Sequence, residues 1–197
     1  MMNPEQQIVL ASSSPRRQEL LACLGLPFRI QVSNVDETTS DGIAPEEIVK
    51  ILSLRKADAV AKNLSFGLVI GSDTIVVLDG QVLGKPRDEE DAFRMLTSLA
   101  GREHEVYSGL AIVDVATGKI ALDYSSTQVK MRTMTAEEIR GYIASKEPMD
   151  KAGSYAIQGL GSTIVERIEG DYFTVVGLPL NRLAQMLNQF GISLLNK

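Results

Sequence analysis

The chain has 197 residues, is 44% hydrophobic and carries 20 Lys and Arg against 25 Asp and Glu, which gives a net charge of −5. This length allows one domain, or two closely joined lobes, with a substantial core. The acidic balance argues against a nucleic-acid polymer as a partner, because proteins that bind one usually carry a basic face. An anion-binding site in this chain must therefore be a local concentration of cations.

Several features predict a cytoplasmic protein with no membrane association. Cys23 is the single cysteine, so no internal disulfide forms, and its place among apolar helix positions predicts a small buried side chain. Met1 to Gln7 lacks the basic and apolar regions of a secretory signal. The most apolar run, 66–78, is interrupted by Asp73 and is too short to span a bilayer. No stretch has the composition of a linker, so we expect a single domain over residues 1–197.

The first packed stretch predicts a short buried strand over 8–11 and then a helix. Ser14 suits the N-cap, proline follows at the first helical position, and Gly25 suits the end of the helix. The start of this helix combines unpaired N–H groups with the hydroxyl of Ser14 and the guanidinium groups of Arg16 and Arg17. Positive charge there opposes the helix dipole, so we expect a bound anion such as a phosphate chain. The alternative is a well-capped helix whose arginines are only solvated.

The next segments predict a strand over 28–33, an acidic turn-rich loop over 34–42 and a helix from Pro45 to about residue 63. The loop contains Glu37, which is either a solvated side chain or a ligand for a cation. Lys56 lies within the helix and, taken alone, has the character of a surface lysine.

A carboxylate interrupts the buried strand expected over residues 68–78. Asp73 would face a low dielectric there and would need a cation or several hydrogen-bond donors to stay ionised. Hydrogen bonding at a strand end is one explanation, and catalysis or metal binding is the one we favour. Asp79 and Gly80 predict a hairpin turn, and the return strand ends near Lys85, which the hairpin would bring back toward Asp73.

The second half of the chain predicts more helices and hairpins. We expect helices over 88–99, 135–146 and 179–190, a hairpin of strands 103–115 and 119–133, and a second hairpin of strands 162–168 and 172–176. His104, the only histidine, is expected at a surface position of its strand. The glycine-rich stretch 147–161, which contains Gln158, is either a plain connection or a loop that approaches a flat ligand closely.

Together these elements predict an α/β fold in which a mixed sheet is flanked by helices. Positive charge comes from Arg16, Arg17, Lys56 and Lys85, and hard oxygen ligands come from Glu37 and Asp73. A nucleoside triphosphate bound with Mg²⁺ needs this combination, because the metal bridges carboxylate and phosphate oxygens while the cations neutralise the remaining charge.

Five motifs, in this order along residues 8–190, resemble the Maf family of nucleoside triphosphate pyrophosphatases. They are Ser12-Ser13-Ser14-Pro15-Arg16-Arg17, Val35-Asp36-Glu37, Gly71-Ser72-Asp73-Thr74, Gly84-Lys85-Pro86 and Asp150-Lys151-Ala152-Gly153-Ser154-Tyr155-Ala156-Ile157-Gln158-Gly159. The sequence departs from the family pattern at Ser72, where alanine is commoner.

The resemblance implies an inosine-triphosphatase-like fold with an elongated mixed sheet and an active cleft between two lobes. It also implies hydrolysis of a nucleoside triphosphate to the monophosphate and pyrophosphate, a divalent metal (Mg²⁺ or Mn²⁺), and a homodimer. By motif position, Asp73 is similar to the family's proton acceptor, and Arg16, Thr74 and Gln158 are similar to its specificity positions. The residues Lys151-Ala152-Gly153 and Ile157-Gln158-Gly159 resemble the branch that acts on dTTP and UTP rather than the branch that prefers 7-methyl-GTP.

Our hypothesis is that Glu37 and Asp73 hold the metal while Asp73 orients or deprotonates the water that attacks the α-phosphorus. Pyrophosphate would then leave with its charge held by Arg16, Arg17 or Lys85. Asp73 is therefore a base, a metal ligand or both. A nucleotide-binding regulator of septum formation without turnover is the alternative of another class. A kinase of the P-loop type is disfavoured, because the sequence contains no G-x-x-x-x-G-K-[ST].

Overall fold

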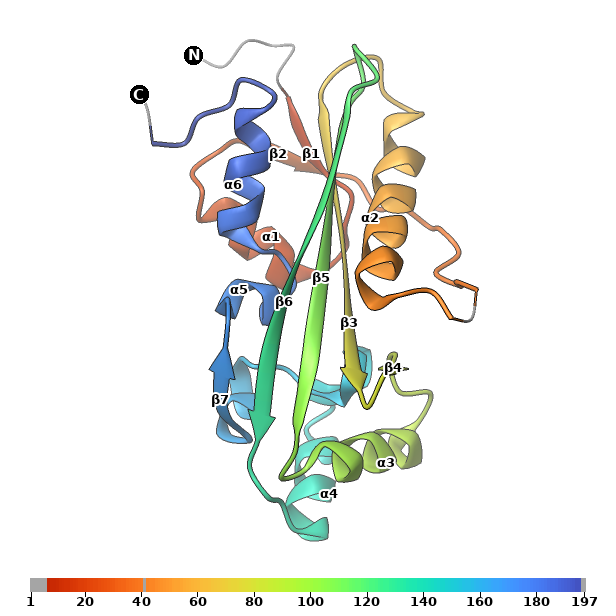
Figure 1. Ribbon diagram of the computed structural model, residues 1–197, viewed down its shortest axis with the longest axis vertical. Coiled ribbons are helices and arrows are strands. Elements are labelled where there is room, and N and C mark those ends of the chain that lie inside the picture. Colours follow the sequence, from red (N-terminus) through yellow and green to blue (C-terminus); the bar gives the residue numbers. More distant parts are fainter. Residues whose placement is uncertain (1–6, 41, 196–197) are drawn as a thin grey trace. The chain divides into compact units, whose positions relative to one another are not determined.

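The protein forms a mixed α/β structure in the computed structural model, which describes residues 7–40 and 42–195 (Figure 1). Its strands are β1 (Ile8–Leu10), β2 (Phe28–Ile30), β3 (Leu68–Leu78), β4 (Gln81–Leu83), β5 (Glu103–Asp114), β6 (Ile120–Met131) and β7 (Val165–Glu169). Its α-helices are α1 (Pro15–Ala22), α2 (Pro45–Ala61), α3 (Glu89–Leu99), α4 (Ala136–Ala144), α5 (Tyr172–Val176) and α6 (Leu180–Asn188). Short 3₁₀ helices within the described residues are η2 (Glu147–Asp150), η3 (Ala152–Ser154) and η4 (Gly159–Thr163).

The strands make one mixed sheet in the order β2-β1-β3-β5-β6-β7, with β4 paired to β3. Strand β1 runs parallel to β2 and β3, whereas the β3–β4 and β6–β7 pairs are antiparallel. The predicted mixed sheet flanked by helices is therefore confirmed. No helix within residues 7–40 and 42–195 has both the length and the apolar character needed to cross a bilayer.

The chain divides into two compact units. The first contains the described residues up to Asp73, Ser108–Ser125 and the described residues from Gly177 onward, and the second contains Thr74–Tyr107 and Ser126–Val176. Strands β3, β5 and β6 contribute residues to both units.

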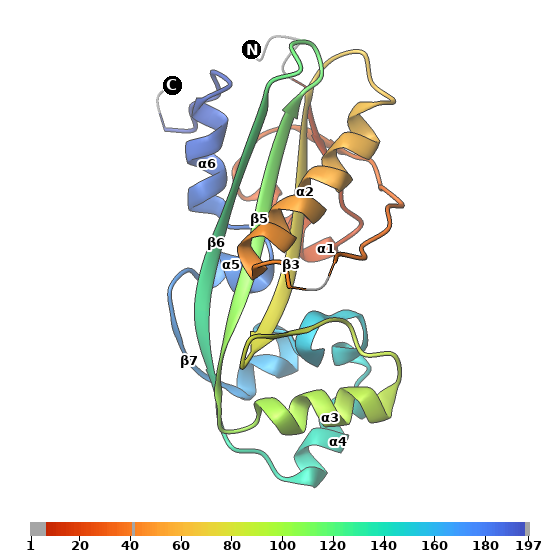
Figure 2. The same cartoon turned by 45° about the vertical axis from the view of Figure 1, so that its right-hand side comes forward.

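In the first unit, α2 packs directly on the backbone of the sheet, as Figures 1 and 2 show. A Cβ atom at Gly71 of β3 would lie 2.1 Å from the carbonyl oxygen of Ser53 in α2, and one at Gly109 of β5 would lie 2.3 Å from that of Val49. Glycine is required at these two positions because the helix leaves no room for a side chain. The core around this contact consists of small and branched residues: Val9, Ala11, Ala57, Val60, Val69, Ala111 and Val113.

In the second unit, α3 and α4 lie side by side in both views and enclose a larger core (Figures 1 and 2). Its buried members include Val76, Leu96, Leu99, Val129, Met131, Ile139, Tyr142 and Tyr155. Both helices begin at capping residues, because the Asp88 carboxylate accepts from the Asp91 N–H and Thr135 forms a capping box with Glu138. These starts, the Pro45 start of α2 and the Asp79-Gly80 turn between β3 and β4 were predictable from local sequence and are confirmed.

The structure overturns three local predictions, the first of which concerns Cys23. This residue is the C-cap of α1 rather than part of its apolar face, and its side chain is exposed. The helix ends at Ala22, so the helical spacing that linked Cys23 to the buried leucines stops before it.

His104 is buried rather than exposed, with 3% of its surface accessible. Exposed and buried residues alternate at the start of β5, and His104 and Val106 lie on its buried face. The Nε2 atom of His104 lies 2.7 Å from the Tyr155 hydroxyl, while Nδ1 has no hydrogen-bond partner among the described residues.

Residues 172–176 form helix α5 and not the second strand of a hairpin. The Asp171 carboxylate accepts from both the N–H and the hydroxyl of Thr174, which is a helix-capping arrangement. The aromatic and β-branched residues that predicted a strand are therefore wound into a turn, and β7 pairs with β6 instead. The first six residues, which lack the features of a secretory signal, and Asp41, which belongs to the predicted acidic loop, lie outside the described residues.

Burial of His104 predicts a loss of stability in acid. Desolvation lowers the pKa of His104 from 6.5 to about 4, so the unfolded chain takes up a proton at this residue before the folded chain does. Its neutral form is fully compatible with folding above pH 6.5, and the stability is lost as the pH falls toward 4.

We expect this residue to account for a loss of about 3 kcal/mol in the free energy of unfolding between pH 7 and pH 4. Urea unfolding of the wild type and of His104→Gln at pH values across this range measures the loss. The variant should lose about 3 kcal/mol less than the wild type. Parallel losses in the two proteins would contradict the assignment.

Candidate functional site

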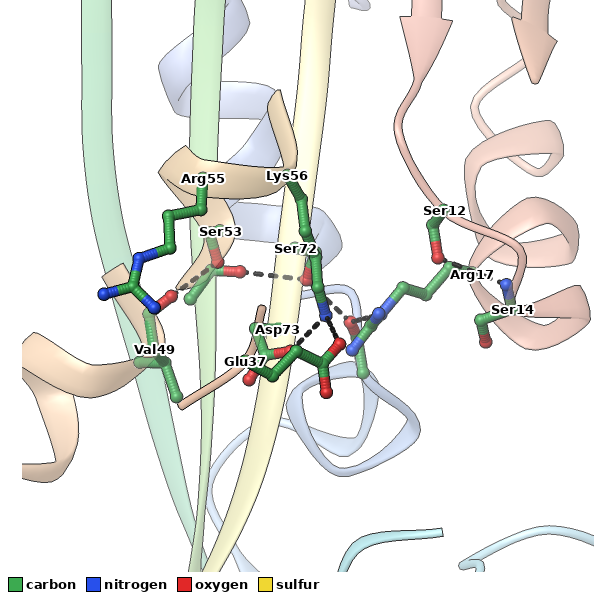
Figure 3. A network of polar contacts seen from close by, with 12 residues as sticks. Ser12, Ser14, Arg17, Glu37, Val49, Ser53, Arg55, Lys56, Ser72 and Asp73 are labelled. Atoms are coloured by element: carbon green, nitrogen blue, oxygen red, sulfur yellow. Dashed lines mark hydrogen bonds and ion pairs between the residues drawn. The ribbon is translucent and has the colours of Figure 1, made fainter. Parts of the chain in front are cut away.

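One lysine ammonium group joins two carboxylates in the first unit. Lys56 Nζ lies 2.5 Å from Asp73 Oδ1 and 2.7 Å from Glu37 Oε1. The side chains of Asp73 and Lys56 are 9% and 12% exposed, whereas that of Glu37 is 50% exposed. The buried carboxylate therefore has the counter-ion that burial demands. The half-exposed Glu37 carboxylate meets the same ammonium group, as Figure 3 shows.

The backbone beside Asp73 is fixed by its neighbour Ser72. The Ser72 hydroxyl is fully buried and lies 2.9 Å from the carbonyl oxygens of both Gly109 and Gly177. One hydroxyl group thus ties β3 to β5 and to the segment that precedes α6. This makes Ser72, the position where the sequence departs from the family pattern, part of the framework of the site.

Arg17 extends from α1 toward the same charges (Figure 3). Its Nε donates a hydrogen bond to the Gly177 carbonyl at 2.8 Å, so Arg17 and Ser72 share one acceptor. Burial lowers the pKa of Arg17 from its ordinary value, and the nearby Asp73 carboxylate opposes that shift. Arginine remains charged in proteins. This part of the site therefore contains two carboxylates, Glu37 and Asp73, and two cations, Lys56 and Arg17.

The start of α1 has the composition expected of an anion site. Ser14 is the N-cap and Pro15 begins the helix, and no acidic residue lies in the first turn. The Ser14 hydroxyl makes no capping hydrogen bond to α1, and the Ser14 N–H donates to the Ser12 hydroxyl at 3.2 Å. Arg16 is half-buried in this turn. Its role in binding substrate remains a prediction, as do those of Ser14 and Arg17.

The second unit contains the other predicted residues, Thr74, Lys85 and Gln158. Thr74 is half-buried in β3, Lys85 is exposed after β4, and Gln158 is half-buried at the N-cap of η4. The motifs around the last two are joined, because the Gly153 N–H donates to the Gly84 carbonyl at 3.0 Å. Within this unit the structure therefore brings together segments that are far apart in the sequence.

Glu147 is a residue of this region that the sequence analysis missed. Its carboxylate accepts hydrogen bonds from the Leu160 N–H at 3.0 Å, the Gly161 N–H at 2.9 Å and the Tyr142 hydroxyl at 2.8 Å. Burial opposes ionisation, but these three donors lower the pKa of Glu147 below its ordinary value. Glu147 thereby anchors the turn that directly follows Gln158. No local sequence signal marks Glu147, because Tyr142 lies five residues before it and Gly161 lies fourteen residues after it.

The two carboxylates also suit a divalent metal. Residues 7–40 and 42–195 contain no group of three or more side chains of the metal-binding types. Glu37 and Asp73 are nevertheless held close to one atom, Lys56 Nζ, and both offer hard oxygen donors. Mg²⁺ is usually bound through one or two carboxylates, with water and substrate phosphates completing its shell, so the donor set fits this ion.

Comparisons with known proteins place the whole described site within one family match. The family model described as Maf-like protein matches residues 7–190. The chain is 50% identical over 187 residues to a dTTP/UTP pyrophosphatase of Desulforamulus reducens, covering 95% of this chain and 98% of the relative. It is 52% identical over 190 residues to a dTTP/UTP pyrophosphatase of Pelotomaculum thermopropionicum, covering 96% of this chain and the whole relative.

A solved structure resembles the fold. The Ham1 protein of Staphylococcus aureus matches with a TM-score of 0.55 and 14% identity, over 94% of this chain and 100% of that one. At this identity the likeness shows a shared fold alone, and it confirms the inosine-triphosphatase-like architecture that the sequence implied.

The ion pair between Lys56 and Asp73 predicts strongly coupled mutations. We expect Lys56→Met to cost about 3–5 kcal/mol in the free energy of unfolding, because it leaves Asp73 buried without a counter-ion. Asp73→Asn combined with Lys56→Met should cost less than the sum of the single changes, with a coupling of about 1–3 kcal/mol. Urea unfolding of the four proteins at pH 7 measures this cycle, and additive costs would rule out the buried ion pair.

Proposed function

Because the chain belongs to the family of Maf-like proteins, we propose that it hydrolyses dTTP and UTP to the nucleoside monophosphate and pyrophosphate. One observation carries the proposal: relatives named dTTP/UTP pyrophosphatase are 50–52% identical to this chain over 95–96% of its length. The linked charges of Glu37, Lys56 and Asp73 support it from the chemistry of the site.

Asp73 is the group that we assign to proton transfer. Its Oδ1 is oriented by the Lys56 ammonium, and its backbone is tied down through Ser72. A fixed carboxylate of this kind can accept a proton from the water that attacks the α-phosphorus. When bound by Glu37 and Asp73, a divalent metal, Mg²⁺ or Mn²⁺, would supply Lewis-acid polarisation of the phosphates.

Cationic side chains take the charge of the triphosphate in this proposal. Arg16, Arg17 and Lys85 are assigned to the phosphates. Arg16, Arg17 or Lys85 would neutralise the negative charge that develops on the leaving pyrophosphate as its bond to the α-phosphorus breaks. Ser14 adds a hydroxyl at the start of α1. Lys56 orients Asp73 through its ion pair with Oδ1.

Recognition of the base is assigned to Arg16, Thr74 and Gln158. The amide of Gln158 offers one donor and one acceptor, which complement the imide edge shared by uracil and thymine. Glu147 supports this assignment, because its hydrogen bonds to Leu160 and Gly161 restrict the turn beside Gln158.

The remaining features of the proposal are a cytoplasmic location, a homodimer and a role in removing unwanted nucleotides, with a link to arrest of cell division. A pyrophosphatase for 7-methyl-GTP and a septum-formation regulator without turnover are the two alternatives. The names of the relatives favour hydrolysis of dTTP and UTP over both alternatives.

Asp73→Asn tests whether the chain is a catalyst. We expect turnover of UTP with Mg²⁺ to fall by about 10²–10⁴-fold, the usual contribution of a positioned general base. Thin-layer analysis should show UMP and pyrophosphate for the wild type, whereas a kinase or a simple phosphatase would leave UDP. Full turnover by the purified variant would remove Asp73 from the mechanism.

Side-by-side turnover of dTTP, UTP, CTP and 7-methyl-GTP tests the assignment of Gln158. We expect dTTP and UTP to be used at least about 10-fold better than CTP, because CTP presents a donor where the imide presents an acceptor. Gln158→Ala should reduce that preference. Equal rates for the four nucleotides in the wild type would leave the assignment without a basis.

A further inference from the structure

Arg55, which precedes Lys56 on α2, binds the main chain on both sides of Glu37. Its Nη1 lies 2.6 Å from the Thr38 carbonyl oxygen and 3.2 Å from the Asp36 carbonyl oxygen. Lys56 meanwhile binds the Glu37 carboxylate. Arg55 and Lys56 point in different directions from the helix, as Figure 3 shows, so the helix holds the loop through two separate groups.

The loop also closes on itself around Glu37. The Asp36 carboxylate accepts from the Thr38 N–H at 2.9 Å and from the Thr38 hydroxyl at 2.7 Å, and these bonds lower the pKa of Asp36. Residues 31–40 form no helix or strand. These side-chain contacts therefore fix the position of Glu37, whereas the hydrogen bonds of the sheet fix the position of Asp73 in β3.

We propose that Arg55 is a positioning residue for Glu37. It holds the carbonyl groups of Asp36 and Thr38, the residues on either side of Glu37, so that the carboxylate is presented to Lys56 and to substrate without first ordering a loop. This inference rests on the proposed function, in which Glu37 contributes to binding the metal and the phosphates. Arg55 itself touches neither Asp73 nor Lys56 in the contacts described above, so its effect is transmitted through Glu37.

The position of Arg55 makes the inference testable in a folded protein. Arg55 lines an open groove of about 410 Å³ together with Val35, Asp36, Thr38, Asp58, Ala59 and Lys62. It is exposed and lies outside the buried core of the unit. Its removal should therefore leave the core packing unchanged. Lys62, which lines the same groove from the C-cap of the same helix, provides a matched control.

A double-mutant cycle tests the transmission through Glu37. The proteins are the wild type, Arg55→Ala, Glu37→Gln and the double variant, with Lys62→Ala as control, and the readouts are kcat and KM for UTP over a range of Mg²⁺ concentrations. We expect Arg55→Ala to lower kcat by about 10-fold and to raise the half-activating Mg²⁺ concentration, the effect of about one charge-assisted hydrogen bond. In the Glu37→Gln background the same change should cost less than about 2-fold, because its target is already lost.

Lys62→Ala should match the wild type in every constant. An equal loss from Arg55→Ala in both backgrounds would overturn the inference, and so would full activity of Glu37→Gln. A loss that appears only as lower thermal stability, with kcat and the Mg²⁺ requirement unchanged, would also overturn it.

Hydrogen–deuterium exchange gives a readout that does not depend on turnover. In the protein without metal or nucleotide, Arg55→Ala should speed exchange in the peptide covering residues 34–40 by about 10-fold, whereas Lys62→Ala should not. Unchanged exchange would show that Arg55 does not hold the loop. If the wild type released no pyrophosphate from any nucleotide, the proposed function would fail, and the exchange experiment would still decide whether Arg55 restrains Glu37.

Discussion

The ion pair between Lys56 and Asp73 is the interaction on which the first unit's site depends. A carboxylate at a buried strand position is unfavourable unless a cation reaches it. For Asp73 this cation is the Lys56 ammonium group, which comes from α2. That reach requires α2 to lie directly on the sheet, which Gly71 and Gly109 permit by having no side chain. The ion pair therefore requires the close packing of α2 on the sheet, and that packing requires glycine at positions 71 and 109.

The two carboxylates on Lys56 are supported by different means. Asp73 stands on a long strand, and the buried Ser72 hydroxyl ties the adjacent backbone to two further segments. Glu37 stands on a half-exposed loop, where the Asp36 carboxylate and the Arg55 guanidinium replace regular secondary structure. A rigid carboxylate suits proton transfer at a defined atom, and an exposed one suits a ligand that arrives from solvent.

The second unit arranges its predicted residues by similar anchors. The Gly153 N–H joins the glycine-rich segment to Gly84, next to Lys85, and the Glu147 carboxylate holds the turn after Gln158. Glycine at position 159 suits a φ of +62°, and a Cβ there would lie 2.4 Å from Glu147 Oε2. The glycine-rich stretch is thus a constrained loop and not a loose connection.

Local chemistry in the sequence was enough to predict the helix starts at Pro15, Pro45 and Thr135, the Asp79-Gly80 turn and the unusual placement of Asp73, because capping, turn geometry and burial of charge act over a few residues. The partners of these residues depend on which distant segments pack together, which residue spacing does not report. Lys56 therefore has the sequence character of a surface lysine, and His104 that of an exposed histidine. The strand-like composition of residues 172–176 conceals the capping role of Asp171. Long-range packing turned Lys56 into a counter-ion and buried His104 against Tyr155. The helix after Asp171 depends instead on a local cap, in which the Asp171 carboxylate accepts from Thr174, and the β-branched and aromatic residues concealed this cap.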